Sequence, residues 1–154
     1  MSVRELPDRH GLKKIKKYEE ATMLINVIVI LTSLLIVVTK FFDCYTTYER
    51  IIRKNQGINY ESNPILRMLM YKLNSGTAVI IFVFFVTLFI VSFVTYMIYK
   101  VYPYLYMKVA YIVIGLFVAI VQTAVVRTNI SSKPNIITQK IFKIYSNMQR
   151  LLKI

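Results

Sequence analysis

The apolar residues of this chain stand in long uninterrupted blocks. Residues 23–39 and 77–99 contain no charged side chain, and residues 109–126 have Gln122 as their one strongly polar member. A water-exposed helix of such length would instead carry polar residues on one face, at a period of about 3.6 residues. About 20 mostly apolar residues suffice to cross roughly 30 Å of hydrocarbon. The pattern therefore predicts three membrane-spanning helices, at about 23–43, 77–99 and 105–126.

Amphipathic segments flank these blocks. Residues 1–22 are basic and place apolar residues at helical spacing, which predicts an interfacial helical turn or two leading into the first span. Within the loop region 55–74, Asn63 before Pro64 is a typical start for a short amphipathic helix. Residues 128–154 are expected to form a linker and a basic amphipathic helix. The expected fold is all-α, with a three-span membrane domain over residues 23–127.

The first helix is expected to extend past the first apolar block. Residues 40–54 contain no glycine or proline, and Glu49 and Arg53 stand in the favourable i, i+4 order. A continuous helix over residues 22–54 would be roughly 50 Å long. Such a helix would protrude from the bilayer or tilt strongly.

A soluble bundle is the alternative interpretation of three apolar helices. It would have to bury all three blocks, and a chain of 154 residues lacks the polar material to cover them. The mean hydropathy of +0.55 agrees with a membrane location. We therefore expect an integral, multi-pass protein of a cell membrane or a viral membrane.

The net charge of +13 lies almost entirely outside the apolar blocks. Basic residues next to a membrane are attracted to anionic headgroups by about 1 kcal/mol each. Nucleic acid attracts such residues too, but lipid is the simpler partner for a protein already in the bilayer. The candidate headgroup or partner contacts are Lys13, Lys14, Lys16, Lys17, Lys140, Lys143, Arg150 and Lys153.

Reactive side chains are scarce. Cys44 is the single cysteine, which excludes an internal disulfide, and His10 is the single histidine, which excludes the usual multi-histidine metal sites. The sequence has no phosphate-binding loop, no HExxH and no nucleophile–histidine motif. We therefore expect no cofactor and name no catalytic residue.

One signature stands between the first two spans. It consists of Asp43, Thr46 and Thr47, then Gly57, then Glu61-x-Asn63-Pro64. On these residues the chain resembles an uncharacterised family of small prokaryotic three-span membrane proteins, with a shared layout over roughly residues 25–127. The chain departs from that family in lacking a basic residue in the second span and in carrying residues 130–154. The resemblance implies a three-span fold and no particular activity.

The signature has a functional and a structural interpretation. Asp43, Thr47, Glu61 and Asn63 could converge on a cation or a polar headgroup, because ionisable residues at membrane depth usually mark a polar interior or a pathway. Alternatively, Lys40 and Arg50 neutralise Asp43, the threonine hydroxyls bond to helical carbonyls, and Asn63 caps a helix. A helix that runs unbroken from residue 43 to residue 54 would place Glu61 roughly 16 Å beyond Asp43 along its axis. The two acids meet only if the helix breaks near Tyr48 or the 55–62 loop folds back.

The expected function is that of a non-catalytic membrane subunit or scaffold, which assembles with itself or with a larger membrane complex. An ion- or proton-conducting oligomer that uses Asp43 and Glu61 is the alternative. A small intramembrane enzyme is the third interpretation.

Overall fold

The computed structural model describes residues 9–54, 57–61, 63–131 and 133–152, and it confirms the expected all-α fold. No strand occurs among the described residues. The helices are α1 Arg9–Tyr48, a π-helical segment η1 Glu49–Arg53, a 3-10 turn η2 Ile58–Tyr60, α2 Pro64–Lys72, α3 Gly76–Lys100, α4 Leu105–Ser131 and α5 Ile136–Leu152.

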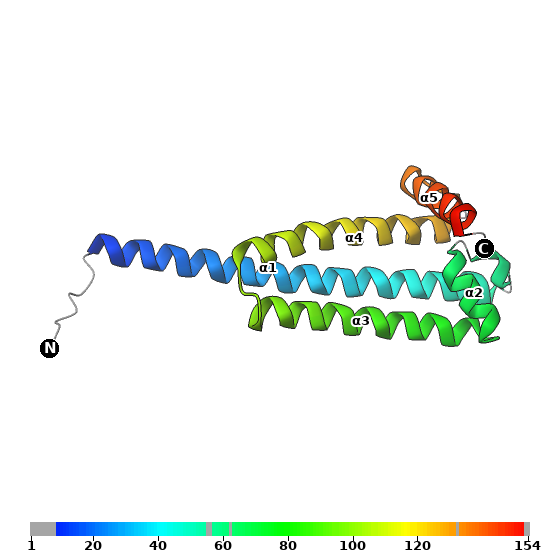
Figure 1. The fold of residues 1–154 in the computed structure, drawn as a ribbon, viewed down its shortest axis with the longest axis horizontal. Coiled ribbons are helices and arrows are strands. Elements are labelled where there is room, and N and C mark those ends of the chain that lie inside the picture. The colour runs from blue at the N-terminus through cyan, green and yellow to red at the C-terminus, as the bar shows by residue number, and fades with distance from the viewer. Residues whose placement is uncertain (1–8, 55–56, 62, 132, 153–154) are drawn as a thin grey trace.

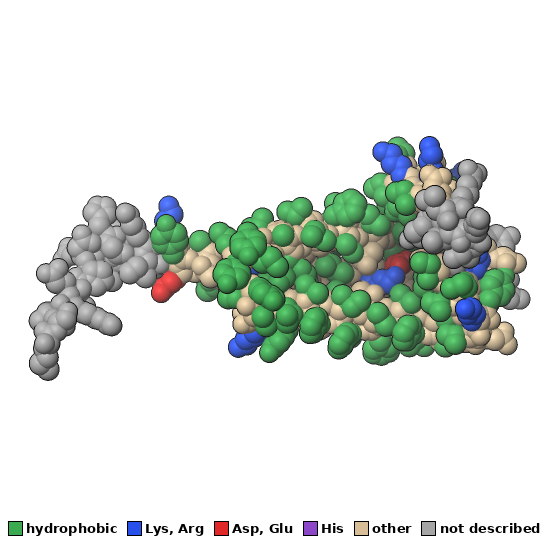
Figure 2. All heavy atoms as spheres, in the orientation of Figure 1, with side chains coloured by type: hydrophobic (Ala, Val, Ile, Leu, Met, Phe, Trp, Pro, Cys, Tyr) green, Lys and Arg blue, Asp and Glu red, His purple; other side chains and the backbone are tan. Residues whose placement is uncertain are grey.

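Three helices are long and apolar enough to cross a membrane, as the sequence pattern predicted. They are Lys17–Arg53, Gly76–Lys100 and Leu105–Ser131. By helix length and composition the chain is a multi-pass membrane protein. Apolar side chains cover the outside of the bundle in Figure 2, and the aromatic residues along α3 illustrate this, with Phe82 61% and Phe89 70% exposed.

α1 is the central helix of the bundle. It lies between α3 and α4 in Figure 1 and makes far more contacts with each of them than they make with each other. Its 40 residues correspond to about 60 Å, twice the thickness of the hydrocarbon core. Its N-terminal part extends beyond α3 and α4, so from Arg9 onward the predicted interfacial segment is continuous with the first span.

α4 also differs from its predicted bounds. We predicted a linker from residue 128, whereas the helix continues through Ser131. The Thr128 side chain is buried and donates to the carbonyl of Ala124 at 3.1 Å. Packing against the rest of the bundle thus keeps this polar segment helical.

Small residues on α4 allow it to approach α1 closely. A Cβ atom at Gly115 would lie 2.5 Å from Thr32 Cγ2 and 3.1 Å from Ile36 Cδ1. Ala119, one turn further along α4, is also buried. Helices in lipid associate through such close packing, because lipid tails are as apolar as the side chains they would replace.

Hydrogen bonds between side chains join the three long helices in the half of the bundle that contains the α3–α4 turn. Ser33 of α1 lies 2.9 Å from the Thr95 hydroxyl of α3 and 2.7 Å from the Tyr111 hydroxyl of α4. Nearer the α3–α4 turn, the buried Lys108 donates to Asn26 Oδ1 at 2.7 Å, and its ammonium lies 5.6 Å from the centre of the Tyr99 ring. These contacts fix the position of α3 and α4 along the axis of α1.

α2 is held at the other end of the bundle by an apolar cluster. Met70 of α2 and Val79 of α3 are almost completely buried and pack with Cys44, Ile51 and Ile80. The start of α3 lies so close to η1 that a Cβ at Gly76 would be 2.7 Å from Ile52 Cδ1. This packing places the beginning of α2 beside the end of α1.

α5 is attached to the end of α4 by polar contacts. Thr138 is completely buried, and its hydroxyl lies 2.7 Å from that of Thr128. Asn135 caps α5 by accepting from the Thr138 N–H at 3.0 Å, while its amide donates to the carbonyl of Ala124 at 2.7 Å. α5 therefore turns away from α4 at a fixed junction (Figure 1).

The close α1–α4 contact generates a first prediction. Gly115→Val places two methyl groups where Thr32 and Ile36 already lie, and overpacking of this kind costs about 1–3 kcal/mol. Thermal unfolding in mild detergent should therefore show a lower midpoint. Ala110→Val adds two methyl groups at an exposed position of α4 and serves as the control. Equal midpoints for the two variants would contradict the close packing at Gly115.

Candidate functional site

A polar cavity of about 190 Å³ lies where α1, α2, α4 and α5 meet. Figure 2 shows basic and acidic groups in a hollow between the apolar surfaces of the bundle, toward the end that carries α5. The volume is enough for several water molecules or a small polar group. The polar side chains that line it are Lys40, Asp43, Thr47, Arg50, Glu61, Asn63, Gln122, Thr128, Asn129 and Thr138.

Asp43 and Glu61 therefore line one cavity, although a straight helix would separate them. The α-helix gives way to a π-helical segment directly after Tyr48, where Lys54 N donates to Glu49 O at 3.0 Å. Gly57 has φ = 87°, a conformation that glycine adopts at little cost, and the chain then turns back through η2. A hypothetical Cβ at Gly57 meets no atom within 4 Å, so its role is conformational.

Lys40 and Asp43 form a partly buried ion pair. Their Nζ and Oδ2 atoms lie 2.7 Å apart, and the two side chains are 13% and 16% exposed. They are spaced i, i+3 on α1 and so lie on one helix face. Two charges at this depth are costly to desolvate, and a close, hydrogen-bonded pair offsets that cost.

Glu61 and Asn63 form a small hydrogen-bonded unit that opens α2. Glu61 is buried, and its Oε1 accepts from the Asn63 N–H at 2.7 Å. Asn63 Oδ1 in turn accepts from the Ile65 and Leu66 N–H groups at 3.0 and 3.4 Å, and Pro64 occupies the first helical turn. The Glu-x-Asn-Pro part of the signature therefore specifies a helix start whose acid faces the cavity.

Burial raises the pKa of the Glu61 carboxyl above its usual range. The Asn63 N–H opposes this shift, the nearby Asp43 charge adds to it, and the Lys40 and Arg50 charges oppose it. Desolvation is the largest of these effects, because the charged carboxylate loses its hydration.

The two signature threonines, Thr46 and Thr47, form hydrogen bonds with Asn129 of α4. The amide of Asn129 donates to Thr46 Oγ1 and to Thr47 Oγ1, each at 3.2 Å, and its Oδ1 lies 3.5 Å from Arg50 Nη1. Thr46 also donates to the Phe42 carbonyl at 2.9 Å, as the structural interpretation expected. Two turns earlier on α1, Thr39 donates to Gln122 of α4.

Asn129 and Thr138 are cavity residues that the sequence analysis did not single out. Gln122 and Asn129 stand seven residues apart, two helical turns, and so lie on the same face of α4. That polar stripe was a usable signal. It was missed because residues from 128 onward were interpreted as a linker.

Three of the predicted headgroup contacts, Lys17, Lys140 and Lys143, are not among the residues that line this cavity. Lys17, Lys140 and Lys143 have exposed side chains. Lys13, Lys14, Lys16 and Arg150 belong to α1 and α5, but their side chains, like the whole of Lys153, lie outside the described residues.

Comparisons of the chain with protein-family models, with curated proteins and with solved structures found no match. The resemblance to a three-span family therefore stays a prediction. Within the described residues, no group of three or more His, Cys, Asp and Glu side chains is placed to hold a metal ion. What the cavity offers is two cationic and two acidic side chains among neutral hydrogen-bonding groups.

The partly buried ion pair generates a second prediction. Lys40→Met leaves Asp43 buried without its partner, and loss of one member of such a pair costs about 3–5 kcal/mol of stability. Lys40→Met/Asp43→Asn removes both charges and should recover most of that loss, as measured by thermal unfolding in detergent. The exposed Glu49–Arg53 pair provides the control, since Glu49→Gln should change the midpoint much less. A double variant no more stable than Lys40→Met would refute the pairing.

The raised pKa of Glu61 generates a third prediction. A folded-state pKa above the unfolded value means that the folded state holds the proton more tightly, so stability falls as pH rises through that window. Glu61→Gln has no proton to lose and keeps an acceptor for the Asn63 N–H. Its unfolding midpoint should therefore rise relative to that of the wild type as the pH increases above about 4, the usual pKa range of a glutamate side chain. The exposed Glu19→Gln is the matched control, and a pH-independent gap for Glu61→Gln would count against burial of the charge.

Proposed function

We propose that this chain is a non-catalytic membrane subunit or scaffold that assembles with itself or with a larger membrane complex. The observation that carries this proposal is the mutual pairing of the polar groups in the cavity. Lys40 pairs with Asp43, Asn129 bonds to both signature threonines, and Glu61 bonds to the start of α2. Among the described residues, no buried side-chain nitrogen or oxygen lacks a partner. Polar groups satisfied in this way stabilise one arrangement of helices.

The outer faces of the bundle support assembly. Phe85 and Phe93 on α3, and Val113 and Phe117 on α4, are more than half exposed. Helix faces of this kind contact either lipid or the spans of another subunit. The exposed Lys140 and Lys143 on α5 suit contacts with anionic headgroups.

Proton or ion conduction is the second candidate, and a specific observation favours it. Asp43 and Glu61 line the same cavity, and burial holds the Glu61 pKa above its usual range. A carboxyl group that takes up and releases protons inside a membrane protein is a common component of proton relays. In this function the two acids would have to stay ionisable, whereas in a scaffold they serve only through their hydrogen bonds and charge pairing.

A fourth prediction tests the scaffold proposal. Native mass spectrometry of the protein extracted in mild detergent should show multiples of the 18.1 kDa chain, or the chain with additional subunits. A single 18.1 kDa species at every detergent concentration would refute assembly.

The same preparation distinguishes the second candidate. Asp43→Asn and Glu61→Gln should leave the assembled mass unchanged in a scaffold, and liposomes containing the wild type should show no flux above that of empty liposomes. A wild-type flux that disappears in both variants would favour conduction instead.

A further inference from the structure

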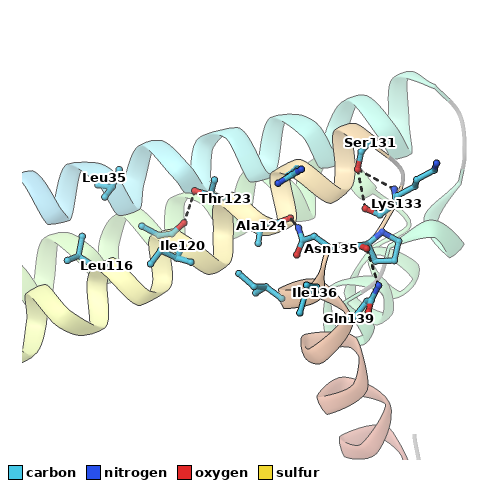
Figure 3. A pocket seen from close by; sticks show the side chains of 14 residues that line it. Leu35, Leu116, Ile120, Thr123, Ala124, Ser131, Lys133, Asn135, Ile136 and Gln139 are labelled. Atoms are coloured by element: carbon cyan, nitrogen blue, oxygen red, sulfur yellow. Dashed lines mark hydrogen bonds between the residues drawn. The ribbon is translucent and has the colours of Figure 1, made fainter.

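A second and larger hollow of about 1070 Å³ lies between α4 and the beginning of α5. Figure 3 shows its floor along α4, from Leu116 past Ile120 to Ala124, with Leu35 of α1 beside it and Ile136 of α5 forming the wall. Ser131, Lys133 and Gln139 lie at its other end. We call this hollow the α4–α5 groove.

The α4–α5 groove is separate from the polar cavity. The two share no lining residue, although both border α4. Gln122, Val125 and Asn129 face the cavity, whereas Ile120, Thr123 and Arg127 face the groove, so the two lie on different faces of α4. The groove therefore has no part in the pairing of Asp43 with Lys40 or in the hydrogen bond between Glu61 and Asn63.

The length of the groove matches one leaflet of a bilayer. From Leu116 to Ser131 the axis of α4 rises about 22 Å. Half of the hydrocarbon core is about 15 Å thick, and the remaining length falls in the headgroup region. A spanning helix of another protein would need an apolar surface along the full core. The groove thus fits the length of a single lipid molecule.

Charge distinguishes the two ends of the groove. Its inner end is lined by Leu35, Leu116, Ala119 and Ile120, while its outer end carries the exposed side chains of Arg127 and Lys133. The Ser131 hydroxyl lies at this same end. Every acidic residue of the chain stands at or before Glu61, so no carboxylate within residues 62–154 opposes these two cations. An apolar trough that ends at two basic side chains is complementary to an acyl chain bearing a phosphate.

The wall of the groove is fixed in place rather than formed by the ligand. Asn135 joins α5 to α4 through its bonds to the Ala124 carbonyl and the Thr138 N–H. The buried Thr128–Thr138 contact holds the same junction from the other side. A preformed site avoids the ordering cost that a flexible one incurs on binding.

We propose that the α4–α5 groove binds one anionic phospholipid. An acyl chain lies along Leu116, Ile120 and Ile136, and the phosphate is held by Arg127 and Lys133. This site goes beyond the scaffold role and requires only that the chain reside in a membrane. Binding is a property of the single chain, so its failure is distinguishable from a failure to assemble.

Lipid titration of the full chain tests this inference. Dioleoylphosphatidylglycerol or dioleoylphosphatidylcholine is added to the protein in mild detergent, and native mass spectrometry measures the bound fraction. The wild type should retain one phosphatidylglycerol in preference to phosphatidylcholine. Arg127→Gln/Lys133→Gln should weaken phosphatidylglycerol binding about thirtyfold, the ratio that corresponds to about 2 kcal/mol for two basic residues. Phosphatidylcholine binding should change little.

Two matched variants separate the groove from general surface charge. Lys54→Gln/Lys72→Gln removes the same charge from exposed positions outside the groove and should leave phosphatidylglycerol binding within a few fold of the wild type. Ile120→Trp fills the trough and should weaken both lipids, with the unfolding midpoint as the check on folding. Equal losses from the two charge pairs, or equal wild-type affinity for both lipids, would overturn the proposal. If Ile120→Trp does not fold, the comparison of the two charge pairs still decides.

Discussion

No water is available inside a bilayer to satisfy a polar side chain, so every such group must find its partner within the protein. The long first helix carries several of these groups, and each one selects a neighbour. Ser33 meets Thr95 and Tyr111, Thr39 meets Gln122, and Asn26 meets Lys108. Because apolar surface gives no preference for one helix over another in lipid, these few polar contacts specify which faces of α3 and α4 pack against α1.

The same requirement explains how one short chain carries both a cavity lined by acidic and basic side chains and a basic exterior. The two acids deepest in the fold, Asp43 and Glu61, are enclosed with Lys40, Arg50 and hydrogen-bonding amides. Beyond Glu61 the chain is free of acidic residues, and Arg127 on α4 and Lys140 and Lys143 on α5 have exposed side chains. Charge pairing inside the fold thus involves residues 40–61, whereas exposed basic residues that can attract anions lie on α4 and α5.

The sequence predicted most of the fold, because span length and hydropathy depend on local composition alone. The three apolar blocks, the Asn63–Pro64 helix start and the basic C-terminal helix all appear as helices. The candidate site was harder to predict. Whether Asp43 and Glu61 meet depends on a π-helical segment after Tyr48 and on a reversal at Gly57, which no periodicity reports. Asn129 was missed because residues such as Thr128, Asn129 and Ser131 are typical of linkers. Its place in α4 is instead supported by hydrogen bonds to Thr46 and Thr47 across the bundle.

The central position of α1 has a consequence for biogenesis. α3 and α4 pack mainly on α1 rather than on each other, and α1 precedes both of them in the chain. Each of these two spans therefore leaves the insertion machinery with its docking surface already present in the bilayer. The chain can assemble one helix at a time, because neither α3 nor α4 needs the other for its main contacts.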